Sequence, residues 1–309
     1  MTLVIAGYNY DGFEQESIYF ATDSNITNQN NVVLVNGFKK VIEIPIKIQG
    51  LNINGGWFNG YYSKPENYTN CTIAFAGSTL VAQHIINSIK NHLSELYPSH
   101  RNGEHILAMQ CERNKHLRNG YCDEDILLDR HIQSLITADY ISKVVEHSIN
   151  AVLDEARKHT SLEAYFSNYR AEFLLGIWCP QDRNYYLYKY EIVRDPVLQA
   201  IVKKTVIKKD SIAIIGSDKF KQSYFKNEVF KAAFGNRIFT KLDRSLLTIF
   251  DRKNSFFEVN NFTDANERVF KLLNETIEYE NSIRSNLIGK PSALFKLDRT
   301  VLKRLKIEK

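Results

Sequence analysis

The apolar run at residues 2–8, Thr-Leu-Val-Ile-Ala-Gly-Tyr, is the feature that most constrains the fold. A turn signal, Asn9-Tyr10-Asp11-Gly12, follows it, and a second apolar run extends over residues 17–23. Two short apolar runs joined by turn residues predict a buried β-hairpin. Because its first strand begins at the second residue, we expect the N-terminus to be held in the fold's framework rather than to fray.

Hydrophobic periodicity predicts the remaining elements. We expect further strands at 40–44, 72–76, 173–179, 185–193, 211–215 and 292–297, with Pro45 and Gly77 ending two of them. Helical spacing predicts helices that begin near Ser78 and Thr137, and Asp264-Ala-Asn-Glu267 has the pattern of a capping box that opens a third. This order of elements favours an α+β layered sandwich.

Composition narrows the class of protein. The 309 residues are 44% hydrophobic and 24% charged, which is ordinary for a globular chain and allows one domain or two. The 40 Lys and Arg exceed the 35 Asp and Glu by five without forming a stripe, so we expect no nucleic-acid partner. The most basic stretch, residues 299–309, is interpreted as a solvated helix end.

The sequence also indicates the compartment. No run reaches the ~20 apolar residues of a membrane span, and the first residues lack a basic leader region, so a cytoplasmic protein without a membrane partner is expected. The four cysteines show no CxxC spacing. His105, Cys111, His116 and Cys122 match no standard zinc finger, and neither a metal nor a cofactor is expected.

The pair Met1-Thr2 carries chemistry of its own. A small second residue permits removal of the initiator Met, which leaves a threonine with its hydroxyl and a free α-amine on the same residue. The α-amine, with a usual pKa of ~7.7 to 8, can accept the hydroxyl proton near neutral pH. Such a residue contains both a nucleophile and its base.

Three segments follow Thr2 in a set order: Ala21-Thr-Asp-Ser24, Lys39-Lys-Val-Ile-Glu-Ile44 and Ile73-Ala-Phe-Ala-Gly-Ser78. With Thr2, this series resembles the proteasome β-subunit family and its bacterial relatives of the HslV peptidase type. The resemblance implies that Thr2 is the nucleophile, Asp23 the buried acid, Lys40 the catalytic lysine and Gly77 the oxyanion donor. It also implies that Ser217, in Ile215-Gly216-Ser217, hydrogen-bonds to the amine of the nucleophile.

The resemblance implies an architecture as well. We expect an α+β four-layer αββα sandwich of two mainly antiparallel sheets, formed by a single domain over residues 1–309. Insertions near 49–70, 99–136 and 225–262 account for the extra length, and the first of these looks like a loop or a small hairpin. Members of the family form rings and often work beneath an ATPase, so the implied partners are a peptide or protein substrate, a homo-oligomeric ring and an ATPase unfoldase.

The expected activity is threonine-dependent peptide hydrolysis through an acyl-enzyme, after removal of Met1. One departure from the family pattern is that residues 281–291 lack the Asp of its D-x-x-S-G-G segment, although Ser282 or Ser285 could replace part of it. Two alternatives therefore stay open: a catalytically inactive structural or partner-binding subunit, and a non-peptide amidase. The site residues have structural alternatives too, because Asp23 and Ser217 could be caps, Lys40 a surface lysine and Gly77 a strand end.

Overall fold

The computed structural model describes most of the chain. The described residues are 2–11, 14–27, 32–55, 57–63, 69–101, 104–112, 132–159, 162, 164–196, 199–209, 211–216, 218, 265–282 and 288–309. Asp264, Ser217 and the predicted insertion at 225–262 lie outside them. The single-domain organisation stays a prediction.

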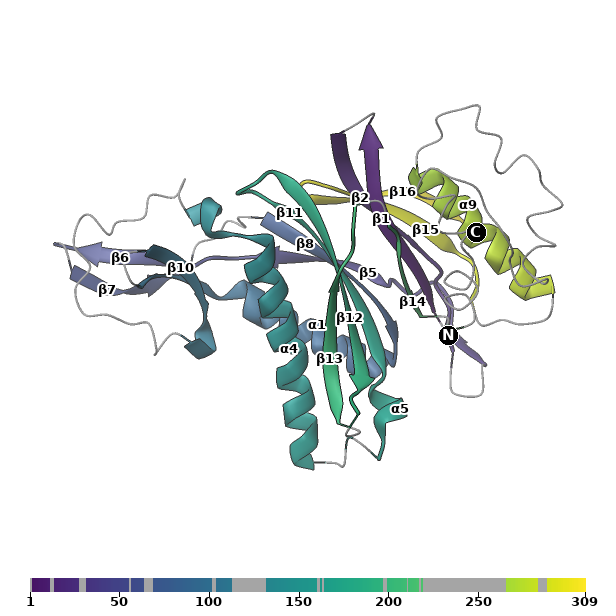
Figure 1. Cartoon of the computed structure of the whole chain (residues 1–309), viewed down its shortest axis with the longest axis horizontal. Helices are drawn as coiled ribbons and strands as arrows, with labels where there is room; N and C mark the ends of the chain where they lie inside the picture. The colour runs from purple at the N-terminus through teal and green to yellow at the C-terminus, as the bar shows by residue number, and fades with distance from the viewer. Residues whose placement is uncertain are drawn as a thin grey trace.

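The N-terminal strands belong to a five-stranded antiparallel sheet in the order β14-β1-β2-β15-β16, here called the N-terminal sheet (Figure 1). Its strands are β1 (Leu3–Asp11), β2 (Glu14–Thr22), β14 (Ala213–Gly216), β15 (Ser292–Asp298) and β16 (Val301–Glu308). The predicted hairpin is confirmed, with Val4 opposite Thr22 and Tyr8 opposite Ile18. Because β14 and β15 flank this hairpin, the start of the chain is enclosed by segments that are remote in sequence.

A second five-stranded antiparallel sheet, the central sheet, has the order β13-β12-β11-β8-β5. Its strands are β5 (Val41–Ile46), β8 (Thr69–Gly77), β11 (Ala171–Cys179), β12 (Asn184–Arg194) and β13 (Ala200–Val206). Strands β8 and β11 are buried along nearly their whole length, which is typical of strands covered on both faces.

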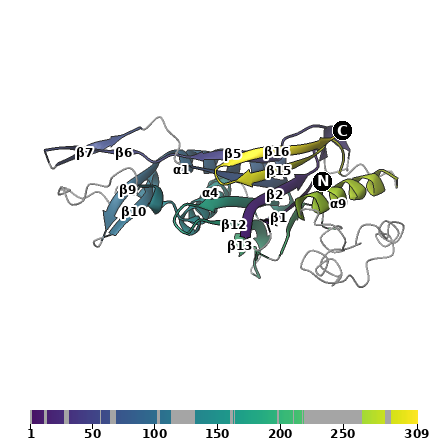
Figure 2. The same ribbon diagram turned by 90° about the horizontal axis from the view of Figure 1, so that it is seen from above.

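Three two-stranded antiparallel sheets complete the β-structure of the described residues. They pair β3 (Ile26–Thr27) with β4 (Val33–Val35), β6 (Gly50–Asn54) with β7 (Trp57–Tyr62), and β9 (Leu96–Arg101) with β10 (Glu104–Met109). The β6–β7 hairpin confirms that the insertion at 49–70 contains a small hairpin. Together with β9 and β10 it projects from one end of the molecule, whereas α9 lies at the other end (Figure 2).

Helices α1 (Thr79–Ser94) and α4 (Ala138–His159) cover the outer face of the central sheet, and α9 (Ala265–Ser282) covers that of the N-terminal sheet (Figure 1). The described residues also form the short helix α5 (Phe166–Tyr169) and 3-10 turns at Gln110–Glu112 and Gln133–Leu135. Helices α1 and α4 share a hydrophobic core with the central sheet, and α9 shares a smaller one with the N-terminal sheet. None of the helices in the described segments has the length and apolar character for a bilayer crossing.

A third core lies between the two large sheets. Val4 and Phe20 from the N-terminal sheet meet Leu174 and Leu187 from the central sheet there. A Cβ on Gly176 would approach the Phe20 ring to 2.8 Å, so the sheets are in close contact at this point. This core holds β1 and β2 against β8 and β11.

The predicted fold class, a four-layer αββα sandwich, is wrong for this chain. The described residues form a mostly β structure with five antiparallel sheets, three of them two-stranded, and a single long helix on the N-terminal sheet. The physical reason is that apolar periodicity reports which side of an element is buried, whereas the number of sheets depends on strand pairing.

Several strands were missed because their patterns are weakly apolar. β13 contains two adjacent lysines, and β16 mixes lysines and an arginine with its apolar residues; each strand lies at an edge of its sheet. The basic tail is thus a strand and not a helix end. Pro45 does not end β5 but lies within it, opposite Asn70, because β5 is also an edge strand and one side of it needs no backbone donor.

The N-terminus of α4 generates a stability prediction. Thr137 Oγ1 accepts a hydrogen bond from the Tyr140 backbone N at 3.1 Å, which confirms Thr137 as the expected cap. We expect Thr137→Ala to lower the free energy of unfolding by about 1 kcal/mol in a urea titration, because it leaves a helix donor unpaired. Thr137→Ser keeps the hydroxyl and should lose much less, and equal losses in the two variants would contradict the capping role.

Candidate active site

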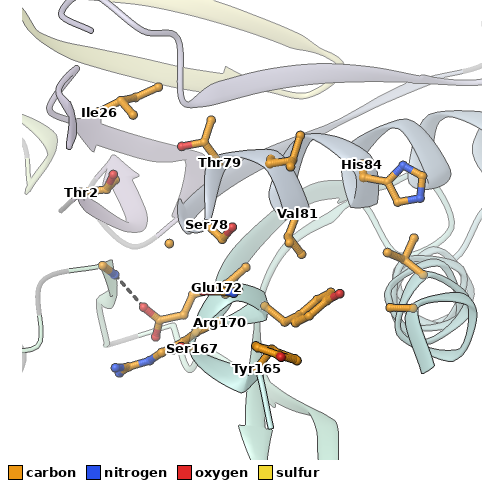
Figure 3. A pocket seen from close by; sticks show the side chains of 18 of the residues that line it. Thr2, Ile26, Ser78, Thr79, Val81, His84, Tyr165, Ser167, Arg170 and Glu172 are labelled. Carbon is orange, nitrogen blue, oxygen red and sulfur yellow. Dashed lines mark hydrogen bonds between the residues drawn. The ribbon is translucent and has the colours of Figure 1, made fainter. Parts of the chain in front are cut away.

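Thr2 lies at the entrance of β1 and is nearly buried, with 9% of its surface exposed. Its neighbour Leu3 pairs with Gly216 at the end of β14. Thr2 lines a cavity of about 1420 Å³ whose wall also includes Gly77 and Glu172 (Figure 3). Thr2 therefore lies next to a paired strand residue and also borders the cavity.

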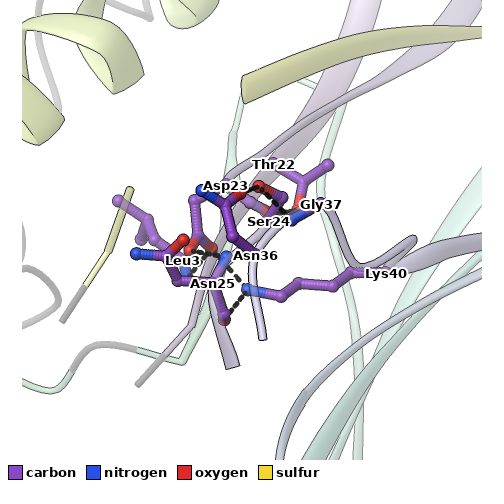
Figure 4. A network of polar contacts seen from close by, with 8 residues as sticks. All are labelled: Leu3, Thr22, Asp23, Ser24, Asn25, Asn36, Gly37 and Lys40. Atoms are coloured by element: carbon purple, nitrogen blue, oxygen red, sulfur yellow. Dashed lines mark hydrogen bonds and ion pairs between the residues drawn. The ribbon is translucent and has the colours of Figure 1, made fainter. Parts of the chain in front are cut away.

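A buried carboxylate holds the segment that contains Thr2. Asp23 Oδ1 accepts a hydrogen bond from the Leu3 backbone N at 2.8 Å, and the Lys40 ammonium donates to the same oxygen at 2.9 Å (Figure 4). The Asn25 backbone N donates to Asp23 Oδ2 at 3.1 Å, and Lys40 Nζ also donates to the Asn25 carbonyl at 2.6 Å. Every one of these bonds is buried, so Asp23 ties three segments of chain together.

Hydrogen bonds in the connection before β5 hold Lys40 in this position. Ser24 Oγ donates to Asn36 Oδ1 and accepts from the Gly37 backbone N, each at 3.2 Å, which holds the connection that leads to Lys40. The Phe75 backbone N donates to the Lys40 carbonyl at 3.2 Å, which ties the residue just before the edge strand β5 to β8. The Lys40 side chain then points inward, although its backbone lies at a sheet edge.

The electrostatics of the ion pair are unusual for a lysine. Only 1% of the Lys40 side chain and none of the Asp23 side chain are exposed. Burial lowers the pKa of the Lys40 ammonium, and the charge and hydrogen bond of Asp23 oppose that shift. Asp23 thus favours the charged form of Lys40 and offsets part of the effect of burial.

Gly77 stands where β8 ends and α1 begins. Its φ is +103°, and a Cβ at this position would lie 2.4 Å from the Arg170 carbonyl oxygen, so the turn requires a glycine. The Ser78 backbone N donates to the Arg170 carbonyl at 3.0 Å, which fixes the turn. The positive end of the α1 dipole therefore faces the cavity that Thr2 lines, as an oxyanion site needs.

The expected site residues are brought together in part. Thr2 and Gly77 line the large cavity, whereas Asp23 and Lys40 line a separate one of about 450 Å³. The ion pair reaches the Thr2 segment through the hydrogen bond from Leu3 N to Asp23. Ser217 lies outside the described residues, so its contact with the Thr2 amine stays a prediction.

Sequence reasoning missed Glu172 and Gly216. The Gly216 backbone N donates to Glu172 Oε2 at 2.7 Å, and both residues line the Thr2 cavity. Glu172 is the one charged residue in the strand Ala171–Cys179, and that isolation within an apolar run is the signal that could have identified it. For Gly216 the sequence indicates only the end of a strand and the position before Ser217.

The candidate metal ligands do not form a site among the residues described. His116 and Cys122 fall outside the described segments. Within those segments no three His, Cys, Asp or Glu side chains gather in a metal-binding arrangement.

Comparison with known proteins gives matches among solved structures alone. No protein-family model and no curated protein matches the chain. An Anbu (Gly-1) mutant from Hyphomicrobium sp. strain MC1 aligns over 100% of this chain and 86% of its own at 12% identity, with a TM-score of 0.43. Anbu (ancestral beta-subunit) from Yersinia bercovieri aligns over 98% of this chain and 87% of its own at 14% identity, with a TM-score of 0.40.

These comparisons correct the family assignment. The similar structures bear the name Anbu, and the assignment to proteasome β-subunits and HslV-type peptidases is wrong as stated. At these identities and TM-scores the likeness supports no argument about fold or activity. The segments behind the assignment are only four to six residues long, so they describe a local constellation and not a family. The ring and the ATPase partner stay predictions.

The buried ion pair yields a prediction about stability. We expect Asp23→Ala to lower the free energy of unfolding by about 3–5 kcal/mol, because it leaves the buried Lys40 ammonium without its counterion and the Leu3 N without its acceptor. The measurement is urea unfolding followed by fluorescence. Asp298→Ala, which removes a surface partner of Lys303, should lose less than about 1 kcal/mol. Comparable losses in both variants would contradict the anchoring role of Asp23.

Proposed function

We propose that this chain is a hydrolase that cleaves amide bonds with Thr2 as an N-terminal nucleophile after removal of Met1. The observation that carries the proposal is the shared oxygen Asp23 Oδ1, which binds both the Leu3 N and the Lys40 ammonium directly behind Thr2. A buried lysine–aspartate pair is not explained by stability alone, since apolar residues of similar volume are often equally stabilising. Tuning an adjacent nucleophile is such a reason.

The proposed reaction begins with attack by the Thr2 hydroxyl on the carbonyl carbon of the amide. The α-amine of Thr2 takes the hydroxyl proton, and the carbonyl oxygen becomes an oxyanion. The Gly77 backbone N and the α1 N-terminus lie on the same cavity and supply positive potential to that oxygen. Collapse of the intermediate returns the proton to the leaving amine and leaves an ester between the acyl group and Thr2.

Water completes the cycle. The α-amine takes a proton from the water, which attacks the ester carbonyl and releases the carboxylic acid. The Thr2 oxygen recovers its proton through the same amine. Lys40 stays protonated throughout, and its positive charge behind the segment favours the neutral, basic amine and the negative oxygen.

The size of the cavity favours a peptide over a small amide. Its volume of about 1420 Å³ exceeds the ~300–1000 Å³ of small-molecule sites. Apolar side chains from several elements line it, among them Leu34 of β4, Val81 of α1 and Val152 of α4. Labelling of Thr2 by an amine-directed or hydroxyl-directed inhibitor without peptide turnover would instead favour the non-peptide amidase, and the absence of labelling would favour the inactive subunit.

The first test concerns Thr2 itself. We expect Thr2→Ala to abolish cleavage of fluorogenic peptide amides, and Thr2→Ser to retain a large part of it, because serine keeps both hydroxyl and amine. Thr27→Ala is the matched control, since Thr27 lines the same cavity but has no free amine. Equal rates in wild type and Thr2→Ala, or an intact mass that retains Met1, would contradict the proposal.

The second test concerns pH. The rate should rise with pH as the α-amine loses its proton near its usual pKa of ~8. At higher pH the rate should fall again as Lys40 loses its proton. Because burial lowers the pKa of Lys40, this fall should begin at a lower pH than the usual lysine pKa of 10.5 would give. In Lys40→Arg the falling limb should disappear from the accessible range, since the guanidinium keeps its charge. The same falling limb in wild type and Lys40→Arg would exclude this role of Lys40.

A further inference from the structure

Glu172 is a buried acid that the proposed chemistry does not yet use. It is the second residue of β11, only 8% of it is exposed, and it lines the cavity beside Thr2 (Figure 3). A carboxylate in such a place carries a large desolvation penalty unless it has partners. Its partners therefore indicate what it does.

Both oxygens of Glu172 are engaged. Oε2 accepts the hydrogen bond from the Gly216 backbone N at 2.7 Å. Oε1 lies 3.6 Å from the Lys189 ammonium, which in turn lies 2.9 Å from Glu191 Oε1. Lys189 compensates the charge, and the short bond to Gly216 is directional. A charge-assisted bond to a backbone N–H is about twice as strong as a neutral one.

Gly216 transmits this contact to Thr2. Its φ is +99°, and a Cβ at this position would come within 1.8 Å of the Thr2 carbonyl oxygen and 3.3 Å of Ala76 Cβ. Gly216 also pairs with Leu3, the residue after Thr2. The backbone of Gly216 thus lies directly against Thr2, and no side chain separates them.

A neighbouring ion pair restrains the same stretch of chain. Arg170 donates to both carboxylate oxygens of Asp218, at 3.0 and 2.8 Å. Residues 216 and 218 are thus both tied to the beginning of β11, one by the buried Glu172 and the other by the exposed Arg170. Of the two anchors, only Glu172 holds the residue that contacts Thr2.

We infer that Glu172 is a positioning residue for Thr2, which acts by fixing the Gly216 backbone against it. The inference rests on the proposed function. Glu172 connects the central sheet to the N-terminal sheet at the nucleophile, so its bond to Gly216 sets how far Thr2 stands from Gly77 across the cavity. A misplacement of about 1 Å at a reacting centre lowers a rate by about 100-fold.

The test compares three variants in peptide cleavage. Glu172→Ala should lower kcat by about 10- to 100-fold with a much smaller change in KM, because it removes the acceptor of Gly216 and so disturbs the alignment of Thr2 more than the rest of the cavity wall. Glu172→Gln keeps an acceptor oxygen and should stay within about threefold of wild type. Glu191→Ala is the matched control, since it alters the same charge cluster without touching Gly216 or the cavity.

A second readout does not depend on catalysis. Amide hydrogen exchange at Gly216 should be faster in Glu172→Ala than in wild type, and unchanged in Glu172→Gln and Glu191→Ala. A kcat that is unaffected in Glu172→Ala, a rise in KM alone, or equal losses in the Ala and Gln variants would each overturn the inference. Loss of the proposed function looks different: Thr2→Ala would then cleave as fast as wild type, while the exchange result would stand.

Discussion

The carboxylate of Asp23 is the interaction on which the rest of this site depends. It sits without exposure to solvent and accepts hydrogen bonds from Leu3, Asn25 and Lys40, which belong to three separate segments. A buried charge is tolerated only when donors surround it. The donors also depend on Asp23, because without it the backbone N of Leu3 would lose its acceptor and the buried ammonium of Lys40 would lose its counterion. Asp23 therefore holds both the first strand, through Leu3, and the positive charge of Lys40 near Thr2.

Two glycines complete the surroundings of Thr2 by allowing backbone to come where a side chain could not. Gly77 turns β8 into α1 against the Arg170 carbonyl, and Gly216 ends β14 against the Thr2 carbonyl. Both have a positive φ, which a residue with a Cβ rarely adopts, and both lie so close to another backbone that a Cβ would not fit. Glu172 then holds one of these glycines through its backbone N. At these two glycines the backbone itself comes close to the cavity and to Thr2.

Much of the element order follows from local sequence. Hydrophobic periodicity and terminal residues predict the apolar strands β1, β8 and β11 and the capped helix α4. The edge strands β13 and β16 are not predicted in this way, since the lysines of both, with the arginine of β16, look like a solvated surface until a neighbouring strand is known. The four-layer sandwich and the assignment to proteasome β-subunits were wrong for a related reason. Short motifs and burial patterns describe local environments, whereas sheet number and family are properties of the whole chain.

The amino-acid sequence by itself determined which groups are available: a threonine in second place, an acid after the second strand, a lysine before the next, and a glycine at a strand-to-helix turn. These are local facts of composition and order. Only the tertiary structure decided that Asp23 bonds to Leu3, that Lys40 lines a different cavity from Thr2, and that Glu172 meets Gly216 across 44 residues. The reason is that such contacts arise from strand pairing and from the packing of one sheet on another, which no short window of sequence contains.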